Sequence, residues 1–203
     1  AREEEPHEAS HQDNGTWAGP SRAPGGVANR HWEMVGFGDG FWAFADPRDA
    51  QTLYVEYQGG NILRVNRRTL ETQEIKPYPA AGEKDLRFNW NTPIHLSPSE
   101  PGTLYVGAQF LFRSRDRGAS WDRISPDLST NDPARQKQED SGGLTKDNST
   151  AENNTTIYAI SESPKNKSVI WAGTDDGNLQ ITRDAGVSWT NVVKNVPGIP
   201  AGT

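Results

Sequence analysis

The sequence predicts an all-β fold made of repeated four-stranded units. One eight-residue pattern occurs twice, as SRDRGASW at residues 114–121 and as TRDAGVSW at residues 182–189. A strand-like segment of similar sequence occurs three times, as TLYV at 52–55 and 103–106 and as VIWA at 169–172. The chain also contains 20 Gly, 14 Pro, 7 Trp, 5 Tyr and 6 Phe in 203 residues, which is typical of short strands joined by tight turns. Four short strands per unit describe one blade of a β-propeller.

The chain begins with a segment for which we predict no strand. Residues 1–30 are acidic and then rich in Gly and Pro, and they show no alternation of apolar and polar side chains, so we expect an arm or linker. Residues 31–80 form the first blade, in which a different polar turn replaces the eight-residue pattern. Its predicted strands are 41–45, 52–57, 61–66 and 72–76.

Two further blades follow, each with the eight-residue pattern. The second covers residues 81–126, with predicted strands at 92–96, 103–108, 110–113 and 121–124. A polar insertion at 127–154, with a marginal helix at 133–140, separates it from the third. The third covers residues 155–195, with predicted strands at 156–161, 169–173, 178–182 and 189–193. Residues 196–203 resemble the lead-in to another blade.

Three blades do not close a propeller, which needs at least about four. Each end of such a segment exposes an edge that invites pairing with another chain. We therefore expect this chain to be part of a larger propeller. Its partners would be the remaining blades or other copies of the chain.

The eight-residue pattern contains residues suited to a tight turn between strands. Asp accepts hydrogen bonds from backbone N–H groups of its own turn, Gly adopts positive φ, and Trp begins the outgoing strand as a large apolar anchor. We assign these residues a structural role and predict no catalytic residue among them. They are Ser114, Asp116, Gly118, Trp121, Thr182, Asp184, Gly186 and Trp189.

This pattern resembles the Asp-box, or BNR repeat, of β-propellers in sialidases, xyloglucanases and sortilin ectodomains. Residues 38–203 are most similar to bacterial sortilin-like propellers, as seen in RFNWNTPIHLSP (87–98), GAQFLFRSRDRGASW (107–121) and WAGTDDGNLQITRDAGVSW (171–189). The resemblance implies a secreted or cell-envelope protein, extracellular or periplasmic. Eukaryotic sortilins carry a cysteine-rich module, so the absence of cysteine here favours a bacterial relative.

Composition excludes several classes of function. The formal net charge is −6 and no cluster of Lys and Arg occurs, which argues against binding nucleic acid. No apolar run is long enough to span a membrane. The absence of cysteine excludes thiol chemistry, and we expect no cofactor.

Propellers bind ligands with the loops that enter the innermost strand of each blade. In this chain those loops are residues 36–41, 85–91 and 152–156. They supply the polar and aromatic groups that we predict as ligand-binding residues, for protein or glycan: Asp39, Arg87, Asn89, Trp90, Asn91 and Glu152. Beside these, we interpret His95 as a satisfied inner histidine of a strand.

Three alternatives remain open from the sequence. A xyloglucanase-like glycoside hydrolase would need two of Asp39, Asp85 and Glu152 to flank one glycosidic bond. A structural subunit of a larger assembly would use the open edges. The insertion could hold Ca²⁺, which prefers several oxygen ligands; its candidate ligands are Asp127, Asp132, Asp140, Asp147 and Glu152. Binding or assembly without catalysis is the function that we predict first.

Overall fold

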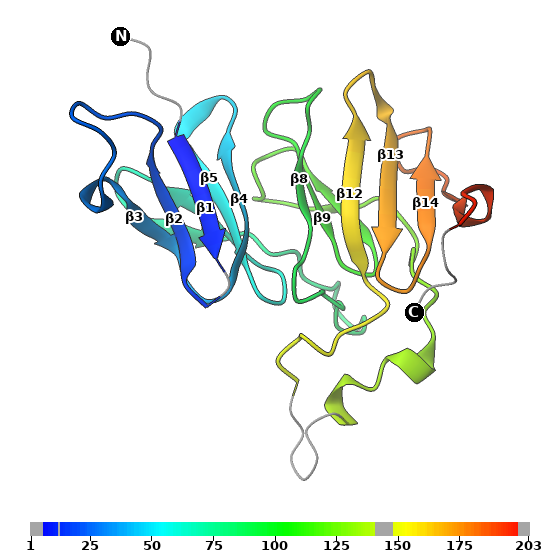
Figure 1. Cartoon of the computed structure of the whole chain (residues 1–203). Coiled ribbons are helices and arrows are strands. Elements are labelled where there is room, and N and C mark those ends of the chain that lie inside the picture. The colour runs from blue at the N-terminus through cyan, green and yellow to red at the C-terminus, as the bar shows by residue number, and fades with distance from the viewer. Residues whose placement is uncertain (1–5, 12, 141–147, 199–203) are drawn as a thin grey trace.

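The computed structural model describes residues 6–11, 13–140 and 148–198, with side chains from residue 13 onward. This part of the chain forms one three-stranded and three four-stranded sheets, all antiparallel. The sheets stand side by side in chain order (Figure 1). Within each four-stranded sheet the strands also follow chain order, so every connection inside a sheet is a hairpin.

The first four-stranded sheet matches the first predicted blade. Its strands are β4 (Gly40–Asp46), β5 (Asp49–Tyr57), β6 (Asn61–Asn66) and β7 (Thr72–Glu74). The β5–β6 turn contains Gly59 and Gly60, both at positive φ, which glycine adopts without steric cost. The four strands predicted between residues 41 and 76 are confirmed.

The next two sheets match the second and third predicted blades. The second contains β8 (Ile94–Leu96), β9 (Leu104–Gly107), β10 (Leu111–Ser114) and β11 (Asp122–Arg123). The third contains β12 (Ile157–Ser163), β13 (Asn166–Thr174), β14 (Leu179–Thr182) and β15 (Thr190–Asn191). Each repeated segment TLYV or VIWA lies in the second strand of its sheet, which explains why the three segments are alike. We refer to these sheets as blades 1, 2 and 3.

The prediction that residues 1–30 form an arm without strands is wrong for the described residues. β1 (Pro6–His11) and β2 (Gly15–Pro20) form a hairpin, and β3 (Glu33–Gly36) completes a three-stranded sheet. The predicted start of blade 1 at residue 31 is therefore also wrong, because β3 belongs to the preceding sheet and blade 1 begins at Gly40.

The side chains of β2 explain why the sequence did not reveal this N-terminal sheet. The strand buries Thr16 and Ala18, which are too small to mark a strand by hydrophobic alternation. Ala18 lies in a cluster with Val35 of β3 and with Leu53 and other residues of blade 1. The sheet is thus stabilised by tertiary packing on blade 1, which a local pattern does not record.

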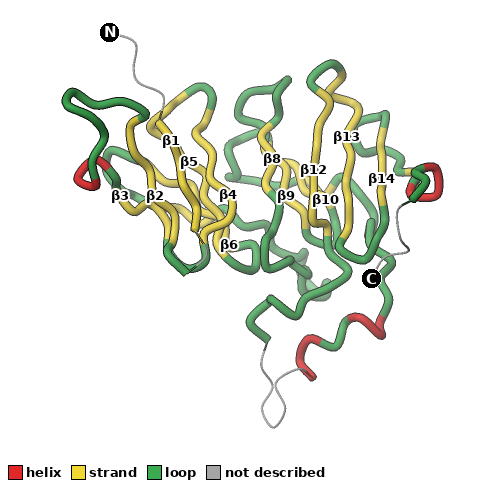
Figure 2. The backbone as a smooth tube through the Cα atoms, viewed as in Figure 1, coloured by secondary structure: helices red, strands yellow, loops and turns green. Residues whose placement is uncertain are grey.

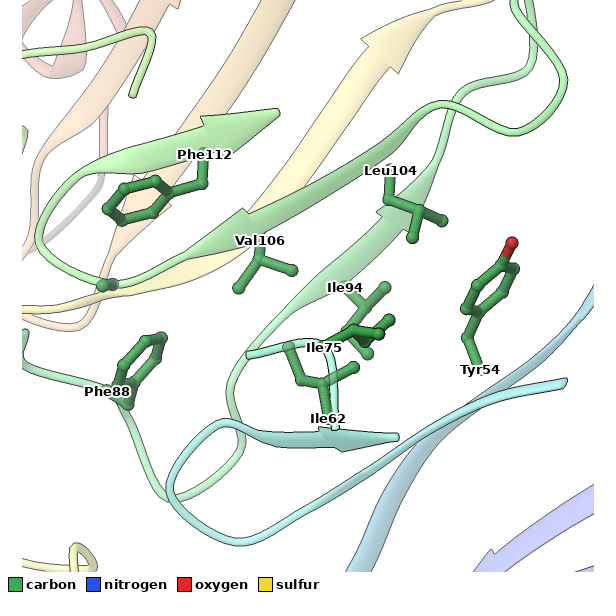
Figure 3. Packing of buried hydrophobic residues seen from close by; sticks show 9 residues of the cluster. Tyr54, Ile62, Ile75, Phe88, Ile94, Leu104, Val106 and Phe112 are labelled. Atoms are coloured by element: carbon green, nitrogen blue, oxygen red, sulfur yellow. The ribbon is translucent and has the colours of Figure 1, made fainter. Parts of the chain in front are cut away.

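Hydrophobic cores fill the spaces between successive sheets. In the core between blades 1 and 2, Tyr54 and Ile62 of blade 1 face Ile94 and Leu104 of blade 2 (Figure 3). A second cluster between blades 2 and 3 includes Tyr105. The molecule is held together by packing between neighbouring sheets, as expected for a repeat protein.

The insertion extends away from the sheets at one end of the molecule (Figure 2). The helix predicted at 133–140 appears as two single turns of 3-10 helix, η2 (Pro133–Arg135) and η3 (Gln138–Asp140). Two 3-10 turns of the same length occur elsewhere in the described residues, η1 (Asn29–His31) and η4 (Val193–Asn195). Residues 141–147 of the insertion and 199–203 of the predicted lead-in lie outside the described residues.

Candidate functional site

The two eight-residue turns have the same internal hydrogen bonds. The Ser114 hydroxyl accepts from the Gly118 N–H at 2.7 Å, and the Asp116 carboxylate accepts from the Ser120 N–H at 2.8 Å. Thr182 Oγ1 accepts from the Gly186 N–H at 3.0 Å, and Asp184 accepts from the Ser188 N–H at 2.9 Å. Hydrogen bonds from the serine hydroxyl and N–H lower the pKa of Asp116 and of Asp184 to about 2. Both carboxylates are therefore ionised acceptors inside a turn.

Each turn also joins its blade to the preceding blade. The Trp121 indole N–H donates to the Ile75 carbonyl at 2.7 Å, and the Trp189 indole N–H donates to the Ile124 carbonyl at 3.0 Å. Ile75 and Ile124 occupy equivalent places in their blades, since the backbone N–H of each donates to a carbonyl of the third strand of the same blade.

An arginine contact also repeats, once at each of these two junctions. Arg64 of blade 1 donates to the Arg117 carbonyl at 3.0 Å, and Arg113 of blade 2 lies 3.4 Å from the Ala185 carbonyl. Both arginines lie opposite a tyrosine of the neighbouring strand, Tyr54 or Tyr105. The turn, its tryptophan and this arginine together form the junction between two blades.

Among the predicted ligand-binding residues, Arg87 contacts both blade 2 and blade 3. Its guanidinium forms an ion pair with Asp127 at 2.7 Å and donates to the Thr155 carbonyl at 3.3 Å. Its backbone N–H donates to Gln109 Oε1 at 2.8 Å. The Arg87 side chain therefore holds the start of the insertion and the entry to blade 3 in place.

Asn89, Trp90 and Asn91 follow Arg87 in the same loop. The Asn89 amide donates to Asp175 Oδ2 and to Thr156 Oγ1, both at 3.0 Å, so it ties this loop to blade 3. Trp90 packs edge-on against Phe41 at 6.3 Å between ring centroids. The Asn91 N–H donates to the Asn89 side chain at 3.0 Å.

Asp39 and Glu152 lie in different local hydrogen-bond networks. Asp39 accepts from the Asp13 N–H at 2.7 Å, and the pocket that it lines contains neither Asp85 nor Glu152. Glu152 accepts from the N–H and hydroxyl of Ser149 within its own turn. Asp85 is exposed. Among the described residues, Asp39 and Glu152 share no hydrogen-bond partner.

The candidate calcium ligands of the insertion also have separate roles where they are described. Asp127 pairs with Arg87, and Asp132 accepts from the Ala134 N–H at the start of η2. Asp140 lies in η3, and Asp147 lies outside the described residues. Across residues 13–140 and 148–198, no group of three or more His, Asp or Glu side chains could hold a metal ion.

A surface pocket of about 370 Å³ lies beside Arg87. Its wall is formed by the segment that enters blade 2, the β9–β10 hairpin, β11 and the insertion. Lys84, Gln109, Phe110, Arg123 and Asn131 line it together with Arg87. Sequence reasoning identified two residues of this pocket, Arg87 as a ligand-binding residue and Asp127 as a candidate calcium ligand. The other residues carry no shared motif, because they come from four separate segments.

The structure also buries an acid that the sequence did not single out. Glu56 of β5 has no exposed surface and accepts from the Thr92 N–H of blade 2 at 3.3 Å. Burial raises its pKa to about 9. His95, by contrast, is the inner histidine that the sequence predicted: its Nε2 accepts from the Glu162 N–H at 3.1 Å, and burial lowers its pKa.

Comparison with solved structures establishes the architecture. The chain is similar to the GH74 xyloglucanase from Xanthomonas campestris, with a TM-score of 0.59, 20% identity and coverage of 98% of this chain and 30% of that one. It is also similar to a GH74 enzyme from Niastella koreensis, with a TM-score of 0.53, 16% identity and coverage of 91% and 27%. The fold is a segment of a β-propeller. This chain spans less than a third of the length of either enzyme.

Other comparisons add little to this result. YCF48 bound to a D1 peptide aligns with a TM-score of 0.43 at 13% identity, over 75% of this chain and 38% of that one. No protein-family model and no curated protein sequence matches the chain. Within the described residues, no helix is long and apolar enough to cross a membrane.

Proposed function

We propose that this chain is a non-catalytic part of a larger β-propeller that serves in binding or assembly, with a further blade covering the free face of blade 3. The hydrogen bonds of the two eight-residue turns support their assignment as Asp-boxes. An extracellular or cell-envelope location, and a relation to bacterial sortilin-like propellers, belong to the same proposal and rest on the sequence resemblance.

One observation carries the proposal. Tyr54 and Tyr105 occupy equivalent positions in blades 1 and 2, and both are buried against the next blade, with 0% and 2% of their surface exposed. Trp171 occupies that position in blade 3 and is 37% exposed. Tyr158 of the same blade is 50% exposed. Blade 3 therefore presents the face that its two predecessors bury.

The repeated junctions define what would cover this face. Val192 is the blade 3 equivalent of Ile75 and Ile124, since its N–H also donates across to the third strand, at Leu179. A covering blade would place an Asp-box tryptophan against Val192. Both such tryptophans of this chain already contact the preceding blade. The proposal therefore favours blades outside these 203 residues over a second copy of the chain.

Glycoside hydrolysis is the alternative function, and it requires a suitably placed pair of carboxylates. A hydrolase places two carboxyl groups about 5–10 Å apart across the scissile bond. Asp39 is held by the N-terminal sheet and Glu152 by Ser149. These separate contacts favour binding over catalysis.

Hydroxyl-radical labelling of Trp171 tests the proposal. We would compare the isolated 203-residue chain with the native product purified from its source cells. We expect strong labelling of Trp171 in the isolated chain and protection in the native product. Trp121, which is engaged at an internal junction in both samples, serves as the control. Equal labelling of Trp171 in the two samples would contradict a covering blade.

A further inference from the structure

The pocket beside Arg87 holds a donor with no partner. Gln109 is only 4% exposed, and its Oε1 accepts from the Arg87 N–H at 2.8 Å. Because a backbone N–H can only donate, the amide oxygen must face Arg87, which fixes the orientation of the amide group. The Gln109 NH₂ group has no hydrogen-bond partner among the described residues, although the residue lines the pocket. The nitrogen is not one of the buried atoms without a partner among the described residues, so it faces the open pocket, where water or a ligand can accept from it.

The charges of the pocket leave one cation unpaired. Arg87 pairs with Asp127 at 2.7 Å, and Arg123 pairs with Glu83 at 3.1 Å. Lys84 has no ion-pair partner within the described part of the chain. Three cations and two carboxylates line the pocket, so its net charge is +1. This charge matches a ligand with one carboxylate better than a dianionic phosphate.

The remaining wall is polar, with a single aromatic ring. Phe110 forms the apolar side, and the Arg123 guanidinium lies 4.7 Å from the centre of its ring. Asn131 and Gln136 add two further amide groups. Pockets for apolar ligands are lined mostly by hydrophobic and aromatic side chains, and this one is not. A compact lining of amide and guanidinium groups suits a ligand that carries many hydroxyl groups.

The geometry points to an acidic saccharide as the ligand, one sugar ring of which occupies this pocket with its single carboxylate. Gln109 and Asn131 donate to ring hydroxyls, and Lys84 binds the carboxylate. Phe110 contacts the apolar edge of the ring. The inference rests on the proposed function in one respect, that the chain binds its ligand without cleaving it.

Calorimetric titration with a trimer of galacturonic acid tests this inference. The matched neutral probe is a trimer of galactose, and sodium acetate tests whether a carboxylate alone is enough. We expect the acidic trimer to bind about tenfold or more tightly than the neutral trimer, since a hydrogen bond to a charged group is stronger than one between neutral groups. Equal affinity for the two trimers, binding of acetate as tight as that of the acidic trimer, or no binding up to about 10 mM would overturn the inference.

Two variants identify the residues responsible. Lys84 is exposed, so Lys84→Gln should leave the fold intact, abolish the preference for the acidic trimer and leave binding of the neutral trimer unchanged. Gln109→Glu keeps the acceptor for Arg87 and removes the donor, so it should weaken both trimers by about threefold or more. Lys165→Gln changes the same charge in an exposed turn of blade 3 and should have no effect. If the Lys84→Gln variant preferred the acidic trimer as strongly as the wild type does, the assignment of Lys84 to the carboxylate would be contradicted.

The outcome is separable from that of the proposed function. Labelling of Trp171 reports on the free face of blade 3, whereas the titration reports on a pocket beside blade 2. Protection of Trp171 together with no saccharide binding would reject the ligand alone. Binding of the acidic trimer followed by its cleavage would reject the non-catalytic role instead.

Discussion

Single side chains at the blade junctions are in unusual electrostatic environments. Asp116 and Asp184 are exposed, yet hydrogen bonds inside their turns keep them ionised. Glu56 is in the opposite situation. It is buried between blades 1 and 2, where it meets the Thr92 N–H, and desolvation opposes its ionisation. Its Oε2 atom has no hydrogen-bond partner among the described residues. An uncharged group is therefore better suited to this position.

Glu56→Gln should stabilise the protein above about pH 5, increasingly as the pH rises. The pKa of Glu56 is raised from 4.5 to about 9 in the folded state. Protonated Glu56 therefore makes its full contribution to the free energy of unfolding below the pKa that it has in the unfolded chain. This contribution is lost as the pH rises toward 9. Glutamine keeps the acceptor and has no proton to lose. We expect a gain on the order of 2 kcal/mol at pH 7 and little change at pH 4.

Urea unfolding at pH 4, 7 and 8.5 measures this effect. Glu152→Gln is the matched control, because Glu152 is partly exposed in a surface turn and bonds only within that turn. It should give no gain that increases with pH. A pH-independent difference between Glu56→Gln and the wild type would contradict the buried, protonated state.

At the scale of elements, the eight-residue turn serves two purposes at once. It reverses the chain between the third and fourth strands of its blade, and it contacts the preceding blade. Gly118 has φ +85°, and a Cβ placed on it would lie 2.6 Å from Ile75 Cδ1 of blade 1. The requirement for glycine is thus both conformational and steric.

Gly118→Ala should destabilise the chain by about 2–4 kcal/mol, because it adds left-handed strain and a clash with Ile75. Gly173→Ala is the matched control: it lies in a strand of blade 3, where a Cβ would meet only Ala159 at 3.8 Å. We expect that change to alter stability by no more than about 0.5 kcal/mol. Thermal unfolding of the two variants provides the comparison. Equal losses would show that Gly118 is not specially required.

At the scale of the whole molecule, stability comes from neighbouring sheets in contact. Each junction between two blades buries a tyrosine from the second strand of one blade against the next blade. Tyr105 also donates to Glu162 of blade 3 at 2.8 Å. Blade 3 has no blade beyond it among the described residues, so Trp171 remains partly exposed. Such chains behave as a sum of repeat and interface contributions.

The equivalent positions should therefore differ in their sensitivity to truncation. We expect Tyr105→Ala to lower the free energy of unfolding by about 3–5 kcal/mol, because it opens a cavity and leaves the Glu162 carboxyl without its donor. Trp171→Ala should cost about 1–2 kcal/mol in the isolated chain, despite the larger side chain. Chemical denaturation of both variants checks this order. A greater loss for Trp171→Ala would indicate that its face is already covered.

Much of the fold could be predicted from local patterns. The three blades and all twelve of their strands follow from segments and turns that repeat along the chain, because these signals lie within a few residues of each other. The N-terminal sheet could not be predicted in this way, since Thr16 and Ala18 are buried only because blade 1 lies against them.

The candidate site likewise contains residues that the sequence predicted and residues that only the tertiary structure brought together. Sequence alone indicated Arg87 and Asn89, which lie in one polar loop, and it determined the turns that join the blades. Only the tertiary structure brought Lys84, Gln109 and Asn131 to one pocket and gave Asp39 and Glu152 different hydrogen-bond partners. Turn chemistry depends on residues within eight positions of each other, whereas a pocket depends on segments whose distance in space the local sequence does not specify.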